Sequence, residues 1–444
     1  MNSEILIILI LLCLSVQVAL SRQLPRMMGA LLIAQMVYWT FSYVVRPVVL
    51  IALQPSPRFG DSLADQRISA GGYHENLPAI LLPILWGLIT YQIGIALIAL
   101  ASRRAAHTEA GRGLRLGRYA LALFTAVYVC GVIARVTWML GVTDSVIGVP
   151  LMLGAIGAGA LVVYAPLSSG KAYALLSALV ASEILWAIVV KSKTPIMALA
   201  VTLLLRFAWF GWTRRRKIVL FLVSAATVAS FSTFHAMKFG EATVANNAAV
   251  AEAYPSIIRP LISIVTRFDL LSAMTDAVLA GPGQWLSGGE FMSRAIQSLV
   301  PQQLLGIDKI TAGRSWAIEM SSQSQIGVGD SVSRAEGFIA EGYALSGLTG
   351  VCVGAVVFAL LTWLVGVLLE SKSALWRLAA LIMVVTPILF ERGLLGFFDS
   401  AGKGVQVILL VACIAVVVRS HPSRQRMLEL PRGVYCSQHR IAHE

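Results

Sequence analysis

A short segment in the last third of the chain gathers charged side chains beside an apolar run. Residues 330–350, DSVSRAEGFIAEGYALSGLTG, place Asp330, Arg334, Glu336 and Glu341 among four glycines. A carboxylate shielded from water can have its pKa raised and then act as a general base towards a hydroxyl group. A neighbouring arginine can stabilise negative charge that develops on a leaving group. Since a plain membrane anchor would need none of these charges, the segment is a candidate reaction site.

Two carboxylates of this segment, Glu336 and Glu341, are the candidate catalytic bases, with Arg334 beside them. They are five positions apart, so a continuous helix would point them about 140° away from each other. We therefore expect only one of them to be catalytic. The alternative for either residue is a structural acid that stabilises the N-terminus of a helix. His74 and His235 are alternative bases, because histidine titrates near neutral pH.

Basic residues elsewhere in the chain could hold an anionic group near these carboxylates. Guanidinium and ammonium groups bind phosphate oxygens through charge-assisted hydrogen bonds. With Arg334, the strongest candidates are Lys191, Lys193 and Arg267. The full set of candidate diphosphate ligands is Lys191, Lys193, Arg267, Arg135, Arg46, Arg259, Arg294 and Arg314. The alternative for each is a side chain that reaches lipid headgroups or pairs with a nearby acid, and Arg135 is equally well explained as half of a structural pair.

Metal ligands and redox cysteines are not indicated by the sequence. Asp269 and Asp276 are seven positions apart and Asp330 stands alone, so no DxD pair or cluster of His and carboxylate ligands is present outside the apolar runs. The five cysteines show no CxxC spacing. We therefore expect chemistry without a metal or another cofactor.

The composition is that of a polytopic membrane protein. Apolar residues make up 57 % of the chain, charged residues 13 %, and the mean hydropathy is +0.79. Continuous apolar runs without alternation predict helices and not barrel strands. The expected fold is all-helical, with about eleven spans. These are Ile5–Leu20, Met27–Val44, Leu77–Leu100, Tyr119–Leu140, Ile147–Val163, Ala172–Val190, Pro195–Phe210, Ile218–Phe234, Tyr343–Leu369, Leu378–Phe390 and Val405–Val418.

Basic residues predict the orientation of these spans. More than half of the Lys and Arg residues fall in one set of turns and in the tail, which the positive-inside rule assigns to the cytoplasm. The amino terminus is then outside and the carboxyl terminus inside. The expected parts are spans one to eight in 1–234, an external cap in 235–342, spans nine to eleven in 343–419 and a basic cytoplasmic tail in 420–444. Arg392 is a further basic residue on the outer side.

The external cap is expected to be ordered and helical. Apolar residues recur at helical spacing between Ile257 and Leu271, which predicts an amphipathic helix on the membrane surface or over a cavity. A second short helix is predicted over Glu290–Leu299, between a glycine-rich turn and Pro301. The basic residues are scattered and not interleaved with aromatic ones, so nucleic acid is not an expected partner.

Two segments of the cap resemble the Wzy-type repeat-unit polymerases of bacterial surface polysaccharides. They are FMSRAIQSLVPQQLLGIDK, residues 291–309, and SRAEGFIAEGYALSGLTGVCVG, residues 333–354. The Arg46-Pro47 pair and the KSKTP turn are also similar to that family. The family has a proline after the lysine, whereas this chain has Ile310 there.

The resemblance implies a glycosyltransferase with a GT-C-like fold at the outer face of the bacterial inner membrane. Its substrate would be an oligosaccharide linked to undecaprenyl diphosphate, and the growing glycan would be transferred to the next lipid-linked unit. The implied partners are the lipid bilayer, a chain-length regulator and a flippase. Two alternatives stay open: an O-antigen ligase, which uses the same kind of donor, and a flippase or transporter of the lipid-linked sugar.

Overall fold

The computed structural model describes most of the chain as helices joined by short turns. The described residues are 2–57, 63–106, 117–142, 147–166, 170–191, 194–226, 254–255, 262, 265–266, 269–300, 310–320, 336–384 and 392–420. Within these ranges every regular element is a helix, so the predicted all-helical class is confirmed for the described part of the chain.

Seven helical segments in the described part are long and apolar enough to cross a membrane, which indicates a polytopic membrane protein. They are α1 (Ser3–Ser21), the continuous series α2 (Arg26–Thr40), η1 (Phe41–Val45) and α3 (Arg46–Leu53), α5 (Tyr73–Ala106), α6 (Arg118–Met139), α8 (Gly170–Val189), α16 (Gly337–Leu369) and α18 (Gly393–Ser420). Each contains or overlaps one of the predicted spans.

Three further predicted spans overlap shorter apolar helices. These are α7 (Gly148–Tyr164), α9 (Thr194–Phe210) and α17 (Ala374–Met383). Residues 385–390 of the predicted span Leu378–Phe390 lie outside the described part. The predicted span at 218–234 is helical over 214–226, and its remaining residues lie outside the described part. The last helix is longer than predicted, because α18 begins at Gly393 and not at Val405. Its first turns are rich in glycine and polar residues, so their hydropathy is too low for a scan of apolar runs to include them.

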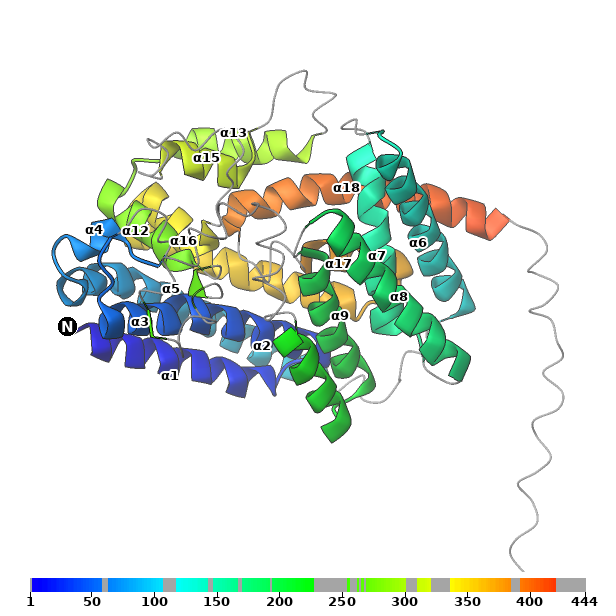
Figure 1. Cartoon of the computed structure of the whole chain (residues 1–444), viewed down its shortest axis with the longest axis horizontal. Helices are drawn as coiled ribbons and strands as arrows, with labels where there is room; N and C mark the ends of the chain where they lie inside the picture. Colours follow the sequence, from blue (N-terminus) through cyan, green and yellow to red (C-terminus); the bar gives the residue numbers. More distant parts are fainter. Residues whose placement is uncertain are drawn as a thin grey trace, which may run out of the picture.

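Four spanning segments form one bundle, in which α1, α2, α5 and α16 lie side by side (Figure 1). Small residues let α5 and α16 approach each other closely. A Cβ atom on Gly87 would lie 3.0 Å from side-chain atoms of Ile339 and Val351, and one on Gly94 would lie 3.0 Å from Ala359. The glycines of α5 therefore position α16.

Polar side chains inside this bundle bond to one another. The Tyr91 hydroxyl donates to the Gln35 amide oxygen at 2.8 Å, and the Gln92 amide nitrogen donates to the Gln17 amide oxygen at 2.9 Å. The Gln35 amide nitrogen donates to the Thr362 hydroxyl of α16 at 3.3 Å. Such bonds offset the cost of placing amides away from water and align the helices along their length.

A second group of helices, α6 to α9, packs beside the first bundle and is crossed by α18 (Figure 1). Helices α6 and α7 touch backbone to backbone, since a Cβ atom on Gly131 would lie 1.9 Å from the Gly154 nitrogen. A Cβ atom on Gly157 would lie 2.5 Å from the Tyr128 nitrogen. Only glycine fits at these crossings.

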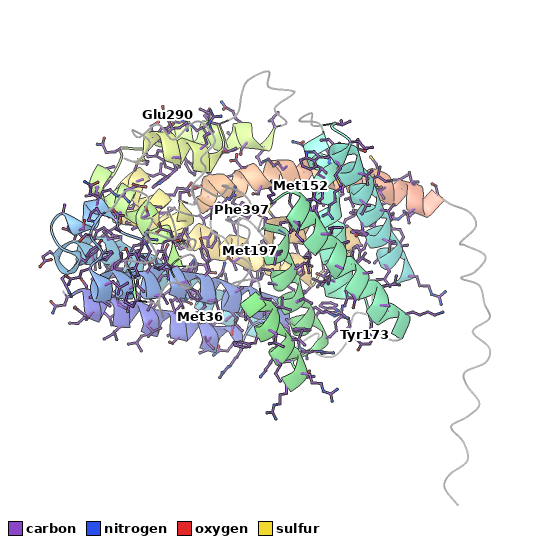
Figure 2. All side chains as sticks on the ribbon, viewed as in Figure 1. Met36, Met152, Tyr173, Met197, Glu290 and Phe397 are labelled. Carbon is purple, nitrogen blue, oxygen red and sulfur yellow. The ribbon has the colours of Figure 1, made fainter. Side chains whose placement is uncertain are left out.

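The described part of the cap contains α12 (Leu270–Ala280), α13 (Gly288–Leu299) and α15 (Ala312–Glu319). The predicted helix over Glu290–Leu299 is confirmed as α13, which begins with a capping box of Ser287 and Glu290. Glu290 lies at the edge of the molecule that α13 forms (Figure 2). The predicted helix over Ile257–Leu271 falls mostly outside the described residues, and α12 begins only at Leu270.

The helix that follows the charged segment differs from the prediction, because it starts at Gly337 and is broken. Ser346 has φ −155° and ψ 26°, and Gly347 has φ 63° and ψ −145°, a backbone conformation open only to glycine. A Cβ atom on Gly350 would lie 2.0 Å from the Gly342 carbonyl oxygen. In a straight helix these residues would be about 12 Å apart, so α16 bends sharply. A short helix carrying Glu341 thus folds against the long one.

Candidate functional site

Glu336 immediately precedes α16 and is fully buried. Its side chain is 0 % exposed, and neither carboxylate oxygen has a hydrogen-bond partner among the described residues. Burial raises the pKa of Glu336 well above its ordinary value, and the neighbouring Glu341 carboxylate adds to this rise. Gly337, with φ 69°, turns the chain between the carboxylate and the helix. A buried acid without a partner is rare in proteins and calls for a ligand or a chemical role.

Glu341 is also buried, but both of its oxygens are occupied. They accept the backbone N–H groups of Leu394 and Leu395, the latter at 3.0 Å. These amides belong to the first turn of α18, where a carboxylate is favoured by the helix dipole. Gly393 has φ 73°, and a Cβ atom there would lie 2.8 Å from the carboxylate. Glu341 therefore serves as the cap of α18, a structural role for a helix distant in sequence and not for the helix that carries it.

The two carboxylates meet at the same place, contrary to the expectation of a 140° separation. That expectation assumed one continuous helix, whereas Glu336 lies outside α16 and Gly337 changes the chain direction. Glu341 contacts the start of α18, and a Cβ atom on Gly396, one turn further, would lie 3.3 Å from Glu336 Oε1. The first turn of α18 thus lines the site from one side.

Two charged residues near this site come from α18 and its approach. Arg392 is exposed, and its charge acts to lower the pKa of Glu336, whereas Asp399 acts in the opposite direction. Asp399 also accepts the backbone N–H of Ala312 at 2.9 Å, which ties α15 to α18. The sequence marked Arg392 as an outer basic residue but gave no reason to place it beside Glu336, because more than fifty residues separate them.

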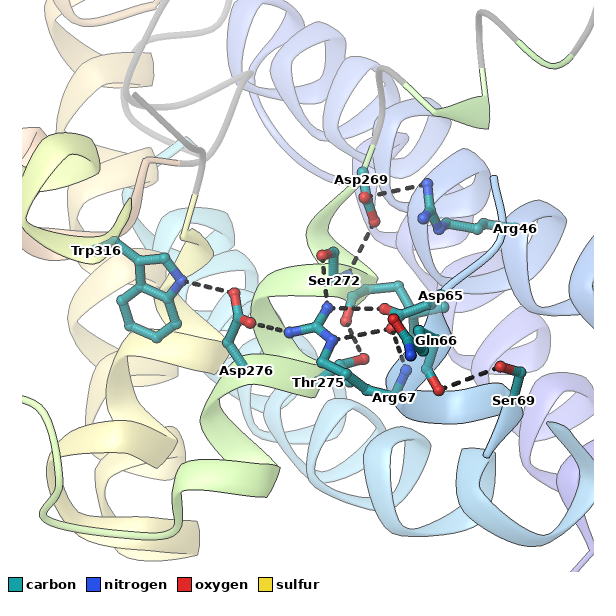
Figure 3. A network of polar contacts seen from close by, with 11 residues as sticks. Arg46, Asp65, Gln66, Arg67, Ser69, Asp269, Ser272, Thr275, Asp276 and Trp316 are labelled. Atoms are coloured by element: carbon teal, nitrogen blue, oxygen red, sulfur yellow. Dashed lines mark hydrogen bonds and ion pairs between the residues drawn. The ribbon is translucent and has the colours of Figure 1, made fainter. Parts of the chain in front are cut away.

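Arg46 is not available as a diphosphate ligand in this structure, because a carboxylate of the same chain holds it. Its side chain is buried and pairs with Asp269 at 3.1 Å, at the start of α12. The π-helical turn η1 directly precedes Arg46, and such turns are frequent at functional sites. Here the turn directs Arg46 at the cap (Figure 3).

Arg67 extends this contact into a network that joins the spans to the cap (Figure 3). It comes from α4 (Gln66–Ser69) and binds both oxygens of Asp65, at 2.9 and 2.7 Å. It also pairs with Asp276 and donates to Ser272 at 3.0 Å, both on α12. The second oxygen of Asp276 accepts the Trp316 indole N–H at 3.4 Å. The network therefore fixes α12 and α15 relative to α4 and to the start of α3.

Arg135 forms a structural pair and not part of the carboxylate site. Its guanidinium binds Glu183 of α8 through two bonds of 2.6 and 2.8 Å and lies 4.9 Å from the centre of the Trp186 ring. Both charged residues are buried. An arginine inside a span normally needs such a partner, so the structural alternative holds for this residue.

The Arg135–Glu183 pair leads to a stability prediction. Glu183→Gln removes the counter-charge but leaves the guanidinium buried, so we expect the free energy of unfolding to fall by about 3–5 kcal/mol. The double variant Arg135→Met/Glu183→Leu should recover most of that loss. Denaturant titration in mild detergent measures both.

A matched control is available in the cap, where Arg294 and Glu319 form a pair of 3.0 Å that is partly exposed. Glu319→Gln should cost less than about 1 kcal/mol, because exposed pairs contribute little. Equal losses in Glu183→Gln and Glu319→Gln would contradict the prediction.

The remaining predicted phosphate ligands do not gather around Glu336 in the described part of the chain. Arg294 donates to Ser315 at 2.5 Å and pairs with Glu319, so it joins α13 to α15. Arg314 lies on α15, and Lys191 is an exposed turn residue with φ 49°. The candidates that lie outside the described residues are Lys193, Arg259, Arg267 and Arg334.

The described residues contain no group of three or more His, Cys, Asp or Glu side chains that could hold a metal ion. His74, an alternative base, contacts Glu4 at 3.0 Å through Nδ1, near the starts of α5 and α1. His235 lies outside the described residues.

No family model, no curated protein and no solved structure matches this chain.

Proposed function

We propose that this protein is a glycosyltransferase that polymerises oligosaccharide repeat units linked to a polyprenyl diphosphate, in the manner of a Wzy-type polymerase. A single observation carries the proposal: Glu336 is a fully buried carboxylate without a hydrogen-bond partner among the described residues, directly before a helix that is long and apolar enough to cross a membrane. A group of this kind suits proton transfer from a sugar hydroxyl, because burial raises its pKa above the ordinary value and so increases its affinity for a proton.

The reaction follows from this role. The acceptor hydroxyl oxygen bonds to the anomeric carbon of the donor, and its proton passes to Glu336. The bond between that carbon and the diphosphate oxygen breaks, and the electron pair leaves with the polyprenyl diphosphate. Arg392, beside the carboxylates and exposed, is the described cation best placed to stabilise the charge on the leaving group. Arg334 is a second cation for this role from the sequence.

Glu341 positions the reaction site in this proposal. By accepting the N–H groups of Leu394 and Leu395, it holds the first turn of α18 against the short helix that carries it. That turn includes Gly396, which packs against Glu336, and follows directly on Arg392. The base and the cation are therefore kept together through one helix cap.

The rest of the architecture is proposed on the same basis. We place the protein in the bacterial inner membrane with about eleven spans in a GT-C-like arrangement, the amino terminus and the cap outside, and the carboxyl terminus inside. The lipid-linked oligosaccharide would reach Glu336 from the outer leaflet. A flippase would supply this substrate, and a chain-length regulator would act on the product.

The test is product analysis with purified full-length protein in proteoliposomes that contain one defined lipid-linked repeat unit. The expected product is a ladder of lipid-linked glycans with increasing numbers of repeats. In cells, deletion should reduce the surface glycan to single repeats. Full-length glycan stranded on its lipid carrier would instead indicate a ligase, and would contradict the polymerase.

A transporter of the lipid-linked sugar is the second candidate, because one observation favours it. Transporters often have a broken helix at their binding site, and α16 is broken at Ser346 and Gly347. A transporter would move the lipid-linked repeat across the bilayer and form no new glycosidic bond. Movement of intact repeats without a ladder, in the same proteoliposomes, would decide for it.

A further inference from the structure

A run of basic residues lies at the turn between α9 and the following helix, far from the carboxylate site. Residues 213–217 read TRRRK, and the helix over 214–226 starts within them. Arg214, Arg215 and Lys217 are exposed, and none forms an ion pair within the described residues. No Asp or Glu occurs in the sequence between Glu183 and Glu241. The local positive charge is therefore not neutralised by this part of the chain.

Two other arginines of this region are used by the fold, which separates them from the exposed three. Arg206 donates to the carbonyls of Val162 and Ala165, at 2.6 and 2.8 Å, and so closes the end of α7. Arg216 donates to the carbonyls of Phe210 and Gly211, at 2.7 and 2.6 Å, at the end of α9. Because the bonds of Arg216 hold this turn against the end of α9, the other three cations lie together on one short segment of fixed backbone.

The surroundings of the exposed cations are apolar and aromatic. Trp212 is exposed immediately before them, and Phe221 and Leu222 are exposed on the helix that follows. Tyr173, at the start of α8, is also exposed, and it lies on the side of the molecule opposite Glu290 (Figure 2). The helix 214–226 lies at the lower edge of the view, whereas α13 and α15 of the cap lie at the upper edge (Figure 1). Aromatic residues beside an apolar helix mark the level of lipid headgroups.

We infer that the turn at 213–217 binds the phosphodiester headgroups of anionic phospholipids, through Arg214, Arg215 and Lys217. Phosphodiesters match guanidinium and ammonium donors, and polybasic segments next to a membrane helix attract anionic lipids. A lipid fits better than a soluble phosphate, because the cations are followed at once by exposed apolar side chains that would contact acyl chains. The inference does not depend on the glycosyltransferase proposal.

The experiment titrates purified full-length protein in uncharged detergent with phosphatidylglycerol or with phosphatidylcholine, and counts bound lipid by native mass spectrometry. The wild type should bind phosphatidylglycerol more tightly. The triple variant Arg214→Gln/Arg215→Gln/Lys217→Gln should weaken that binding about a hundredfold at low salt, at about fivefold per cation. Binding of phosphatidylcholine should not change.

A matched control removes the same charge elsewhere, in Arg22→Gln/Arg118→Gln/Lys372→Gln, where all three residues are exposed. This variant should keep its affinity for phosphatidylglycerol, and so should Arg214→Lys/Arg215→Lys, which tests charge without loss of fold. Equal weakening in both glutamine triples would show that only net charge matters, and would overturn the inference. So would displacement of the lipid by millimolar inorganic phosphate at constant ionic strength, since the site would then prefer a soluble anion.

Discussion

Glu336→Gln is expected to lower the rate of glycan transfer about 100- to 10,000-fold, the range over which a general base contributes to catalysis. Glutamine has nearly the shape of the carboxylate but cannot take up the proton of the acceptor hydroxyl. Glu336 has no hydrogen-bond partner among the described residues, so its replacement breaks no structural contact there. The rate is measured with purified protein and a defined lipid-linked repeat, at equal protein abundance.

Two variants make this result specific. Glu341→Gln should reduce the stability of the protein, because the amide cannot cap α18 with two acceptor oxygens. Glu290→Gln changes an exposed acid on α13 and should leave the rate unchanged.

Because the base must be ionised, the wild-type rate should rise with pH until the raised pKa of Glu336 is passed. Transfer at the wild-type rate in Glu336→Gln would refute the assignment.

Arg67→Ala is expected to destabilise the cap by about 3–5 kcal/mol, the second large effect. The variant leaves Asp65 and Asp276 buried without the cation that both of them contact. Opening of α12 is the local readout, and hydrogen exchange of its amides measures the free energy of that opening. Arg22→Ala, at an exposed position, is the control and should leave the exchange unchanged.

The size of this effect should depend on pH in a defined direction. Burial alone would raise the pKa of Asp65, but the hydrogen bonds and charge of Arg67 outweigh it and hold the pKa below its ordinary value of 3.8. In the wild type, the stability that Asp65 contributes is present above pH 3.8 and is lost as the pH falls through the lowered pKa. In Arg67→Ala, the Asp65 carboxylate stays buried without the guanidinium. Its protonation at low pH then removes the cost of the buried charge.

The gap between wild type and Arg67→Ala should therefore be largest at neutral pH and should shrink as the solution is acidified. A gap that stays constant down to pH 3 would mean that the guanidinium acts by packing and not by charge. A loss below about 1 kcal/mol at neutral pH would show that the pair behaves as an exposed one.

Local patterns were sufficient for the helical elements of this protein. Continuous apolar runs predict helices because a backbone in lipid must satisfy its own hydrogen bonds. The capping residues Ser287 and Glu290 and the glycines before them likewise define α13 within one turn. Hydropathy missed the first turns of α18, since those residues are positioned by contacts with α13 and Glu341 and not by lipid.

The sequence did not predict which charged residues form ion pairs with one another. Arg46 and Asp269 are more than two hundred residues apart, as are Arg67 and Asp276, and only folding brings each pair within bonding distance. A basic residue on the outer side reads equally as a phosphate ligand or as half of an ion pair. The structure assigned Arg46, Arg135 and Arg294 to ion pairs by placing a carboxylate against each guanidinium.

The two glutamates show the same division most clearly. By itself the sequence determined that two carboxylates stand at the entry to a spanning helix, among glycines that weaken the helix there. Tertiary structure decided which of them has acceptor oxygens without a partner among the described residues, because the first turn of α18 comes from a distant part of the chain and its amides occupy Glu341. Glu336 is buried beside the same turn but accepts no hydrogen bond from the part of the chain that the structure describes, since a backbone amide can satisfy only an acceptor that the fold brings within reach.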